Sequence, residues 1–476
     1  MNTSTTAATL SLACLLAPGV HAISPDCPVV RLSGPEGLAQ TFGLDMLMLN
    51  DRHLIVGDKA ALSLCPGGTP LGCGAGAIFA FEPLHGGWIH RQTIIPPDIQ
   101  FNDSFGRGKI LYQRSPDRLV TMSNRFDGER MGMGHVYEHD GEEWREVSRF
   151  LAPDGQPLSP FGTRSALHDD TLLISQSSRV HRYREVDGQW QYQDTTRQPD
   201  FISTSHPSIF GGGGLSLDGD WAFIGALRDG THGTQHGSVV AYRRGADGSL
   251  AFAQYLLPPA DATGRVPDME WFGMDLGFDG RTLVVGATAA SRDFEHQGVA
   301  YVYELDGDTW TFRQELRSSQ PGTLPGHREQ FGFGISLDGD TLIVGYAVPE
   351  APLRRTHLFR RGADGLWREA AILEPGAAAP TPAWGFGRNS TMHGRWAVIS
   401  ASGEGTTGAA YIFDLECILN ACKPDLDRDS ILTIFDFFEF QNLFAAGDLR
   451  ADFDGDGELT LFDFLAFQTA FAEGCE

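Results

Sequence analysis

A Phe-Gly pair recurs seven times between positions 42 and 387 of this 476-residue chain, at intervals of 49 to 63 residues. The pairs begin at Phe42, Phe105, Phe161, Phe210, Phe272, Phe331 and Phe386. Each pair is followed, about ten residues later, by a short β-rich run such as Leu54–Gly57 or Leu283–Gly286. A period of this length indicates a repeat architecture, in which each unit is one small sheet that packs on its neighbours.

Within a repeat, the sequence predicts four short antiparallel strands. An Asp-Gly turn separates the first two, as in Leu217–Asp220 and Leu337–Asp340. A third strand follows, for example Gly298–Tyr303, and a second Gly turn leads to a fourth strand that often starts at Trp, as in Asp306–Trp310. Such a unit is typical of a β-propeller blade, so we predict an all-β, seven-bladed propeller. A stacked array of sandwiches is the alternative.

The two ends of the repeat region predict how the ring closes. The seventh unit stops after its third strand, Tyr411–Asp414, whereas Val29–Leu32 forms a spare strand before the first Phe-Gly pair. If the spare strand completes the seventh blade, no sheet edge remains open there. This pairing brings together Cys27, before the spare strand, and Cys417, after the incomplete blade, so we predict a disulfide between them.

The repeat motif resembles a known family. Phe272-Gly273 followed by Val285-Gly286-Ala287 is similar to the FG-GAP repeat, which builds integrin-α-like propellers, and the resemblance covers nearly all of 27–417. It implies that the propeller loops bind a protein or carbohydrate ligand. Many FG-GAP blades carry an Asp-x-Asp-x-Asp-Gly calcium loop, but that pattern does not occur before residue 425. We therefore expect no calcium in the propeller.

An acidic loop is present twice after the repeats, with an offset of 27 residues between Asp425 and Asp452. Each copy places oxygen ligands at the EF-hand positions 1, 3, 5, 7, 9 and 12, with a backbone carbonyl at position 7. Hard Ca²⁺ prefers such a set of oxygens. We predict two Ca²⁺ ions, bound by Asp425, Asp427, Asp429, Ile431, Thr433 and Asp436, and by Asp452, Asp454, Asp456, Glu458, Thr460 and Asp463.

An apolar segment, predicted to be a helix ended by Gly447 or Gly474, follows each loop. Loop plus helix, twice, looks like a dockerin, an α-helical module that docks onto a cohesin-type receptor or another surface or scaffold protein. Ser430 stands where the loop favours Gly, so we expect weaker binding at the first site.

The partner-reading loop positions 10 and 11 are polar in most dockerins. Here they are apolar: Ile434, Phe435, Leu461 and Phe462. Either the partner surface is apolar, or these side chains belong to the module core and the partner is not a standard cohesin. FG-GAP repeats joined to a short C-terminal dockerin ending in Gly-Cys look like the secreted, dockerin-anchored repeat proteins of some bacteria.

The chain begins with features of a secretory signal. Ala7–Val20 is apolar, and Val20-His21-Ala22 offers a small-residue cleavage site. A lipoprotein signal ending at Cys14 is the alternative. We therefore divide the chain into a signal peptide (1–22), the propeller (23–417) and the dockerin-like domain (418–476), and expect a secreted, extracellular protein that is held at a surface.

Six cysteines follow Cys14, an even number that suggests three disulfides. Their positions favour Cys65–Cys73 and Cys422–Cys475 besides the closing pair, out of fifteen pairings. The net charge of −25 argues against a nucleic-acid partner. No apolar run is long enough to span a membrane, and we expect a monomer.

The sequence contains no recognisable catalytic signature. His232 and His236 lie in one loop without nearby acids, and we expect them to face solvent. If the first strand of each blade lines the central channel, residues three positions after each Phe face one another there. Four of these are polar or charged and predict a site for a small ligand: Asp45, Arg164, Asp275 and Asn389. We expect a non-enzymatic binding or adhesion protein; a polysaccharide-degrading enzyme carried on a dockerin is the alternative.

Overall fold

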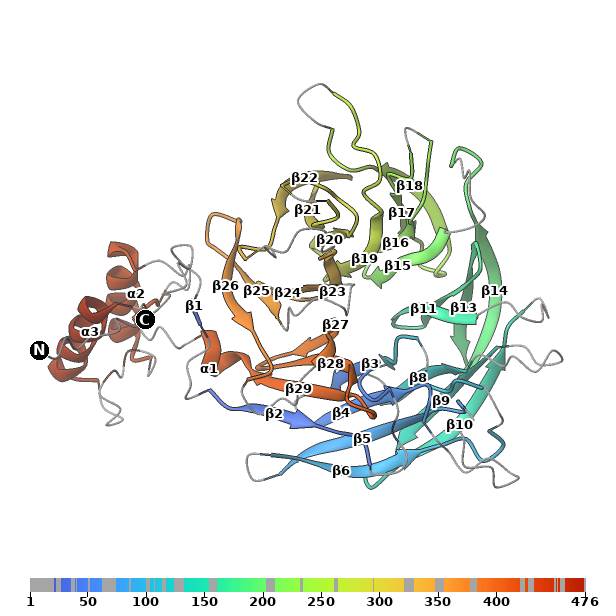
Figure 1. Ribbon diagram of the computed structural model, residues 1–476, viewed down its shortest axis with the longest axis horizontal. Helices are drawn as coiled ribbons and strands as arrows, with labels where there is room; N and C mark the ends of the chain where they lie inside the picture. The colour runs from blue at the N-terminus through green and yellow to red at the C-terminus, as the bar shows by residue number, and fades with distance from the viewer. Residues whose placement is uncertain are drawn as a thin grey trace, which may run out of the picture.

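A computed structural model shows a seven-bladed β-propeller followed by a small helical region (Figure 1). Each of the seven sheets contains at least four strands, so the all-β propeller prediction is confirmed. The structure describes residues 21–22, 27–35, 39, 41–49, 52–61, 74–84, 87–99, 103–106, 108–113, 117–123, 132–153, 161–202, 210–231, 234–260, 264–293, 295–320, 329–346, 355–376, 383–419, 424–426, 432–448, 451, 453 and 459–474.

The strands of each blade follow one another in the sheet in chain order. Blades 1 and 2 contain β3 (Asp45–Leu49), β4 (His53–Asp58), β5 (Ala77–Leu84), β6 (Gly87–Ile94), and β7 (Leu111–Gln113), β8 (Arg118–Ser123), β9 (Met133–His139), β10 (Trp144–Leu151). Blades 3 and 4 contain β11 (Phe161–His168), β12 (Thr171–Gln176), β13 (Arg179–Val186), β14 (Gln189–Arg197), and β15 (Phe210–Asp218), β16 (Trp221–Ala226), β17 (Ser238–Arg244), β18 (Leu250–Leu256).

Blades 5 to 7 complete the ring. Blades 5 and 6 contain β19 (Phe272–Phe278), β20 (Thr282–Ala287), β21 (Val299–Asp306), β22 (Thr309–Leu316), and β23 (Phe331–Asp338), β24 (Thr341–Tyr346), β25 (Thr356–Arg361), β26 (Trp367–Leu373). Blade 7 contains β27 (Ala383–His393), β28 (Trp396–Glu404), β29 (Ala409–Asp414) and β2 (Val29–Leu32). The first strand of each blade contacts the first strand of the next, from β3 round to β27 and back to β3, so the ring is closed.

The Phe-Gly pairs explain why the repeat joins one blade to the next. All seven Phe side chains are buried, and Phe272, for example, packs with Phe223 and Val239 of the preceding blade. All seven Gly residues have φ between 75° and 100°, a region that side chains rarely adopt. At Gly273 an added Cβ would lie 2.7 Å from the Ser238 carbonyl oxygen. Each pair therefore combines an apolar anchor with a backbone turn that only Gly makes without strain.

A second device links the outer strands of neighbouring blades. The Gln254 side-chain amide donates to the Trp310 carbonyl at 2.9 Å, and its oxygen accepts the Trp310 N–H at 2.8 Å. Gln314 and Trp367 form the same reciprocal pair between blades 5 and 6, as do Gln92 and Trp144 between blades 1 and 2. These bonds satisfy backbone groups that otherwise lack a ladder partner.

The predicted closure of the ring is confirmed. β2 pairs antiparallel with β29, from Val29 opposite Phe413 to Leu32 opposite Ala410. A disulfide joins Cys27 and Cys417, which are 390 residues apart in the sequence. Two residues of the predicted signal segment, β1 (His21–Ala22), lie parallel to β26 and extend blade 6 to five strands; cleavage after Ala22 would remove this pairing.

Among the described residues, the helices lie near the C-terminus: α1 (Leu415–Leu419), α2 (Ile434–Ala446) and α3 (Leu461–Glu473). The two longer helices end at Gly447 and Gly474, as predicted. In the part of the chain that the structure describes, no helix is long and apolar enough to cross a bilayer. Residues 1–20 and the other two predicted cysteine pairs, Cys65–Cys73 and Cys422–Cys475, lie outside the described residues.

Candidate functional site

The two C-terminal helices begin with the same local structure. Thr433 caps α2 by accepting a hydrogen bond from the Phe435 N–H, and Asp436 accepts the Thr433 N–H at 2.7 Å. In α3, Thr460 and Asp463 make the same two contacts at 3.1 and 2.7 Å. This capping box satisfies N–H groups that a helix N-terminus leaves unpaired.

The same two carboxylates also hold the start of each acidic loop. Asp436 accepts the Leu426 N–H at 2.8 Å and Asp463 accepts the Phe453 N–H at 2.7 Å, so loop position 12 lies beside position 2 in both copies. Both aspartates are fully buried, and Asp425 is 9% exposed. Buried carboxylates that hold both ends of an acidic loop suit a hard cation such as Ca²⁺.

Of the twelve predicted calcium ligands, Asp425, Thr433, Asp436, Thr460 and Asp463 are described. The remaining seven lie outside the described residues: Asp427, Asp429, Ile431, Asp452, Asp454, Asp456 and Glu458. The donors that the structure places are oxygens only, which fits Ca²⁺. Asp425, Asp436 and Asp463 would hold the two ions together with the loop residues between them.

The side chains at loop positions 10 and 11 are exposed. Ile434 and Phe435 are 57% and 62% exposed, and Leu461 and Phe462 are both 68% exposed. The core of the module is formed instead by residues such as Phe440, Leu443 and Phe467. Of the two alternatives left by the sequence, the structure therefore favours an apolar surface over a core role for these four residues.

The central channel of the propeller contains a cavity of about 260 Å³. Its lining includes all four residues predicted to form a polar ring: Asp45, Arg164, Asp275 and Asn389. Arg164 Nε donates to the Gly213 carbonyl at 3.0 Å, and Asp275 accepts the Ile335 N–H at 3.0 Å, so side chains of one blade bond to the backbone of the next. The ring is therefore fixed by contacts between blades.

Lys109 also lines this channel, although the position three residues after Phe105 is its neighbour Gly108. The Lys109 residue is exposed and lies among the side chains that line the channel. Desolvation in this narrow space lowers the pKa of Lys109, whereas the carboxylates of Asp275 and Asp45 act in the opposite direction. Two acids and two bases then face one cavity, an arrangement suited to a small polar or zwitterionic ligand.

A second cavity, of about 710 Å³, opens between blades 1 and 2. His53 at the start of β4, Glu82 near the end of β5 and His139 at the end of β9 line it. His53 Nδ1 lies 3.5 Å from Glu82 Oε1, and the His53 and His139 rings are 4.9 Å apart. Desolvation lowers the pKa of His53, and the neighbouring His139 lowers it further. Spacing along the sequence does not reveal this group, because its members are separated by 29 and 57 residues.

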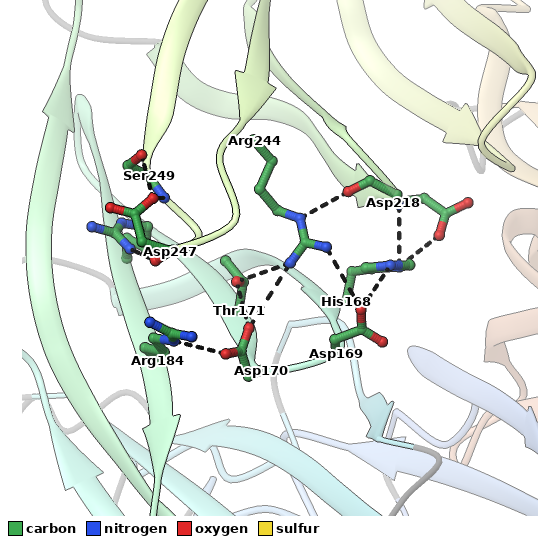
Figure 2. A network of polar contacts seen from close by, with 11 residues as sticks. His168, Asp169, Asp170, Thr171, Arg184, Asp218, Arg244, Asp247 and Ser249 are labelled. Atoms are coloured by element: carbon green, nitrogen blue, oxygen red, sulfur yellow. Dashed lines mark hydrogen bonds and ion pairs between the residues drawn. The ribbon is translucent and has the colours of Figure 1, made fainter.

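The corresponding place between blades 3 and 4 is filled by a charged network (Figure 2). Arg244 of blade 4 donates to the Gly219 carbonyl at 2.8 Å and lies 3.6 Å from Asp169 of blade 3. His168 Nδ1 lies 2.7 Å from Asp218 Oδ1. Here the groove between two blades is closed by ion pairs.

Comparisons with known proteins identify no family. No protein-family model and no curated protein matches this chain. Among solved structures, a functionally unknown protein from Desulfotomaculum acetoxidans DSM 771 is similar at 11% identity, covering 74% of this chain and 97% of that chain, with a TM-score of 0.43. A candidate 6-phosphogluconolactonase from Bacteroides uniformis ATCC 8492 is similar at 12% identity, covering 74% and 89%, with a TM-score of 0.47. At this distance the likeness transfers no activity to this chain.

His236 corrects a smaller prediction. It is fully buried, and its Nδ1 lies 2.6 Å from the Gly237 carbonyl, so it does not face solvent. The loop that carries it is held between blades 4 and 5, because the His236 carbonyl accepts the Phe272 N–H at 2.9 Å. His232 lies outside the described residues. The burial of His236 is explained by its packing beside the Phe272-Gly273 pair of blade 5.

Proposed function

We propose that this chain is a secreted, non-enzymatic binding propeller of the FG-GAP type, tethered to a surface or scaffold protein by a calcium-dependent, dockerin-like module. The observation that carries the proposal is the arrangement of the two helix starts. In both copies a buried aspartate lies at loop position 12 while the two residues before it are exposed and apolar. The metal loop would thus fix the geometry of a surface that is suited to a protein partner.

The exposed apolar residues define the kind of receptor. Six large apolar side chains at the starts of α2 and α3 are each at least 48% exposed, and we name them the apolar docking face: Ile434, Phe435, Phe438, Leu461, Phe462 and Leu465. Large exposed apolar side chains at the starts of both helices indicate a protein-binding surface, and aromatic residues supply much of the binding energy at such sites. The receptor is therefore expected to present an apolar groove rather than the polar surface that most dockerins read.

The docking proposal is tested with the full secreted chain and envelope proteins of the source organism. Calcium-loaded protein should bind one receptor, and the double variant F435S/F462S should lose most of this binding, because each buried aromatic anchor contributes about 2 kcal/mol or more. A chelator should have the same effect on the wild type. The receptor is identified by cross-linking through a residue next to the docking face.

The matched control is Leu151→Ser, which removes an apolar side chain of 49% exposure from β10 of the propeller. This variant should bind the receptor like the wild type. Equal binding by F435S/F462S and wild type, or binding that persists in chelator, would show that the attachment does not use the module.

For the propeller itself, we propose that its loops bind a protein or carbohydrate and that the channel binds a small polar ligand. The enzymatic alternative has one observation in its favour, because Asp45 and Asp275 line the same cavity and paired carboxylates are the usual machinery of glycosidases. Incubation with a panel of polysaccharides decides between them. We expect no released reducing sugar; turnover that is abolished by Asp45→Asn or Asp275→Asn would establish an enzyme.

A further inference from the structure

We propose that His53, Glu82 and His139 bind one divalent transition-metal ion, of the Zn²⁺ type, in the groove between blades 1 and 2. This site differs from the calcium module in place and in chemistry. One ligand atom from each residue lies within 4.8 Å of the other two, and all three side chains are half-buried. Two imidazoles and a carboxylate are a common ligand set for zinc when a fourth position stays open.

The distances are compatible with coordination after small side-chain rotations. Ligand atoms around a tetrahedral zinc lie about 3.4 Å apart when the bonds are about 2.1 Å long. The separation of 3.5 Å between His53 Nδ1 and Glu82 Oε1 already fits. A metal on His139 would replace a hydrogen bond of 3.3 Å from the Gly141 N–H to Nδ1.

Neighbouring residues hold the three ligands in place. Arg91 Nε donates to Glu82 Oε2 at 2.8 Å, which leaves Oε1 directed toward His53. The Trp144 ring lies 5.0 Å from His139 and 6.0 Å from His53 and limits the rotation of both imidazoles. Outer partners that orient ligands in this way are characteristic of metal sites. The cavity of about 710 Å³ beside them leaves space for water or a carboxylate ligand on the metal.

The repeat offers an internal comparison. The strand register places Arg118 of blade 2 where blade 1 has His53, and this arginine forms an ion pair of 2.5 Å with Glu138. It places Arg244 and Arg361 where blade 2 has His139, and each pairs with an acid of the preceding blade, Asp169 or Glu304. In the groove between blades 1 and 2, imidazoles replace these arginines around Glu82. Glu82 keeps the ion pair with Arg91 of its own blade, as Glu304 does with Arg313. A bound divalent cation would supply the positive charge that Arg361 of the next blade supplies to Glu304.

The test uses the full chain, purified without a polyhistidine tag, stripped with chelator and returned to saturating Ca²⁺. Titration with Co²⁺, followed by its visible absorption, and with Zn²⁺, followed by calorimetry, should each show one ion per chain. Glu82→Gln and His139→Gln should each weaken binding more than about tenfold, and Arg91→Ala should weaken it by about tenfold. His90→Gln, a histidine of the same blade outside the groove, should bind like the wild type.

Near-UV circular dichroism and Ca²⁺ stoichiometry show whether each variant is folded, so a loss of binding can be assigned to the site. Absence of a Co²⁺ absorption band in the wild type, or equal Zn²⁺ affinity in wild type, Glu82→Gln and His139→Gln, would overturn the proposal. Because Ca²⁺ is saturating throughout, either result leaves the calcium-dependent docking untouched. Conversely, a failure of docking leaves this metal site in place.

Discussion

At the scale of single residues, the glycine of each Phe-Gly pair is held by two separate constraints. Its φ is positive in all seven blades, and in several blades a backbone oxygen lies where a side chain would begin. Gly307, in the β21–β22 turn of blade 5, also has a positive φ of 61°, but an added Cβ would meet nothing within 4 Å. A comparison of the two positions therefore separates the free-energy cost of the backbone conformation from that of the steric clash.

We predict that Gly273→Ala destabilises the propeller by about 3 kcal/mol, from about 1–2 kcal/mol of backbone strain plus the contact with the Ser238 carbonyl. Gly307→Ala in the same blade should cost only the strain, about 1 kcal/mol. Equilibrium unfolding in denaturant measures both. If the two variants were equally stable, the requirement for glycine at the Phe-Gly pair would not come from close packing.

His168 gives a prediction for pH dependence. Its hydrogen bond to Asp218 raises the pKa of His168, and burial opposes this rise. A raised pKa in the folded state means that the stabilisation is complete below the ordinary histidine pKa and is lost as pH rises through the folded value. His168→Asn should therefore reduce stability at about pH 5.5 and have a smaller effect at about pH 8.5.

The size of this effect is limited, because the imidazole is 26% exposed and its partner 34% exposed. We expect less than about 1 kcal/mol. The measurement is the difference in unfolding midpoint between wild type and variant across this pH range. Asp218→Asn should produce the same pH dependence, and a difference that grows with rising pH would contradict the assigned sign.

At the scale of elements, the disulfide and β2 together close the ring. Removal of both cysteines, as C27S/C417S, should lower stability by about 5 kcal/mol in the chain-entropy model, since the bond closes a loop of 390 residues. The loss is measured as the difference in the free energy of unfolding between wild type and variant under oxidising conditions. Under reducing conditions this difference should shrink. The variant should also be cut first near β2 by protease. Unchanged stability in the double variant would mean that the β2–β29 pairing alone holds the ring.

The repeat made most of the fold predictable from the sequence. Phe-Gly spacing, Asp-Gly turns and Trp-led strands locate the blades, and the incomplete seventh unit with a spare N-terminal strand predicts the closure that β2 and Cys27–Cys417 confirm. The channel ring was predictable for the same reason, because equivalent positions of a closed ring must face one another. Lys109 was not predicted, because the residue three positions after Phe105 in blade 2 is Gly108.

The groove between blades 1 and 2 was not predictable from spacing along the chain. His53, Glu82 and His139 come from three strands of two blades, and they meet only once β4, β5 and β9 are in register. A signal was nevertheless present. In the aligned repeats, Arg118 of blade 2 stands at the position of His53, and Arg244 and Arg361 of blades 4 and 6 stand at the position of His139. Each histidine therefore takes a place that an ion-pairing arginine holds in another blade.

At the scale of the whole molecule, the propeller and the C-terminal module should respond differently to loss of calcium. The propeller is closed by a disulfide and by packing between seven blades, whereas α2 and α3 share a small core formed around Phe440 and Phe467. The segment 418–476 contains thirteen acids and three bases. Without a cation, the repulsion among these acids opposes the folding of so small a core.

We therefore predict that a chelator unfolds the module and leaves the propeller intact in the full chain. Limited proteolysis should then remove residues beyond Cys417 and leave a resistant fragment, whereas calcium-loaded protein should resist cleavage. Calorimetry should find two Ca²⁺ ions per chain, and Asp436→Asn or Asp463→Asn should weaken one of them by more than about tenfold. Glu439→Gln removes a charge of the same helix outside the loop positions and should change neither affinity. Two unchanged Ca²⁺ affinities in both aspartate variants would show that the cations bind elsewhere. Equal proteolysis with and without calcium would show that the metal does not control the apolar docking face.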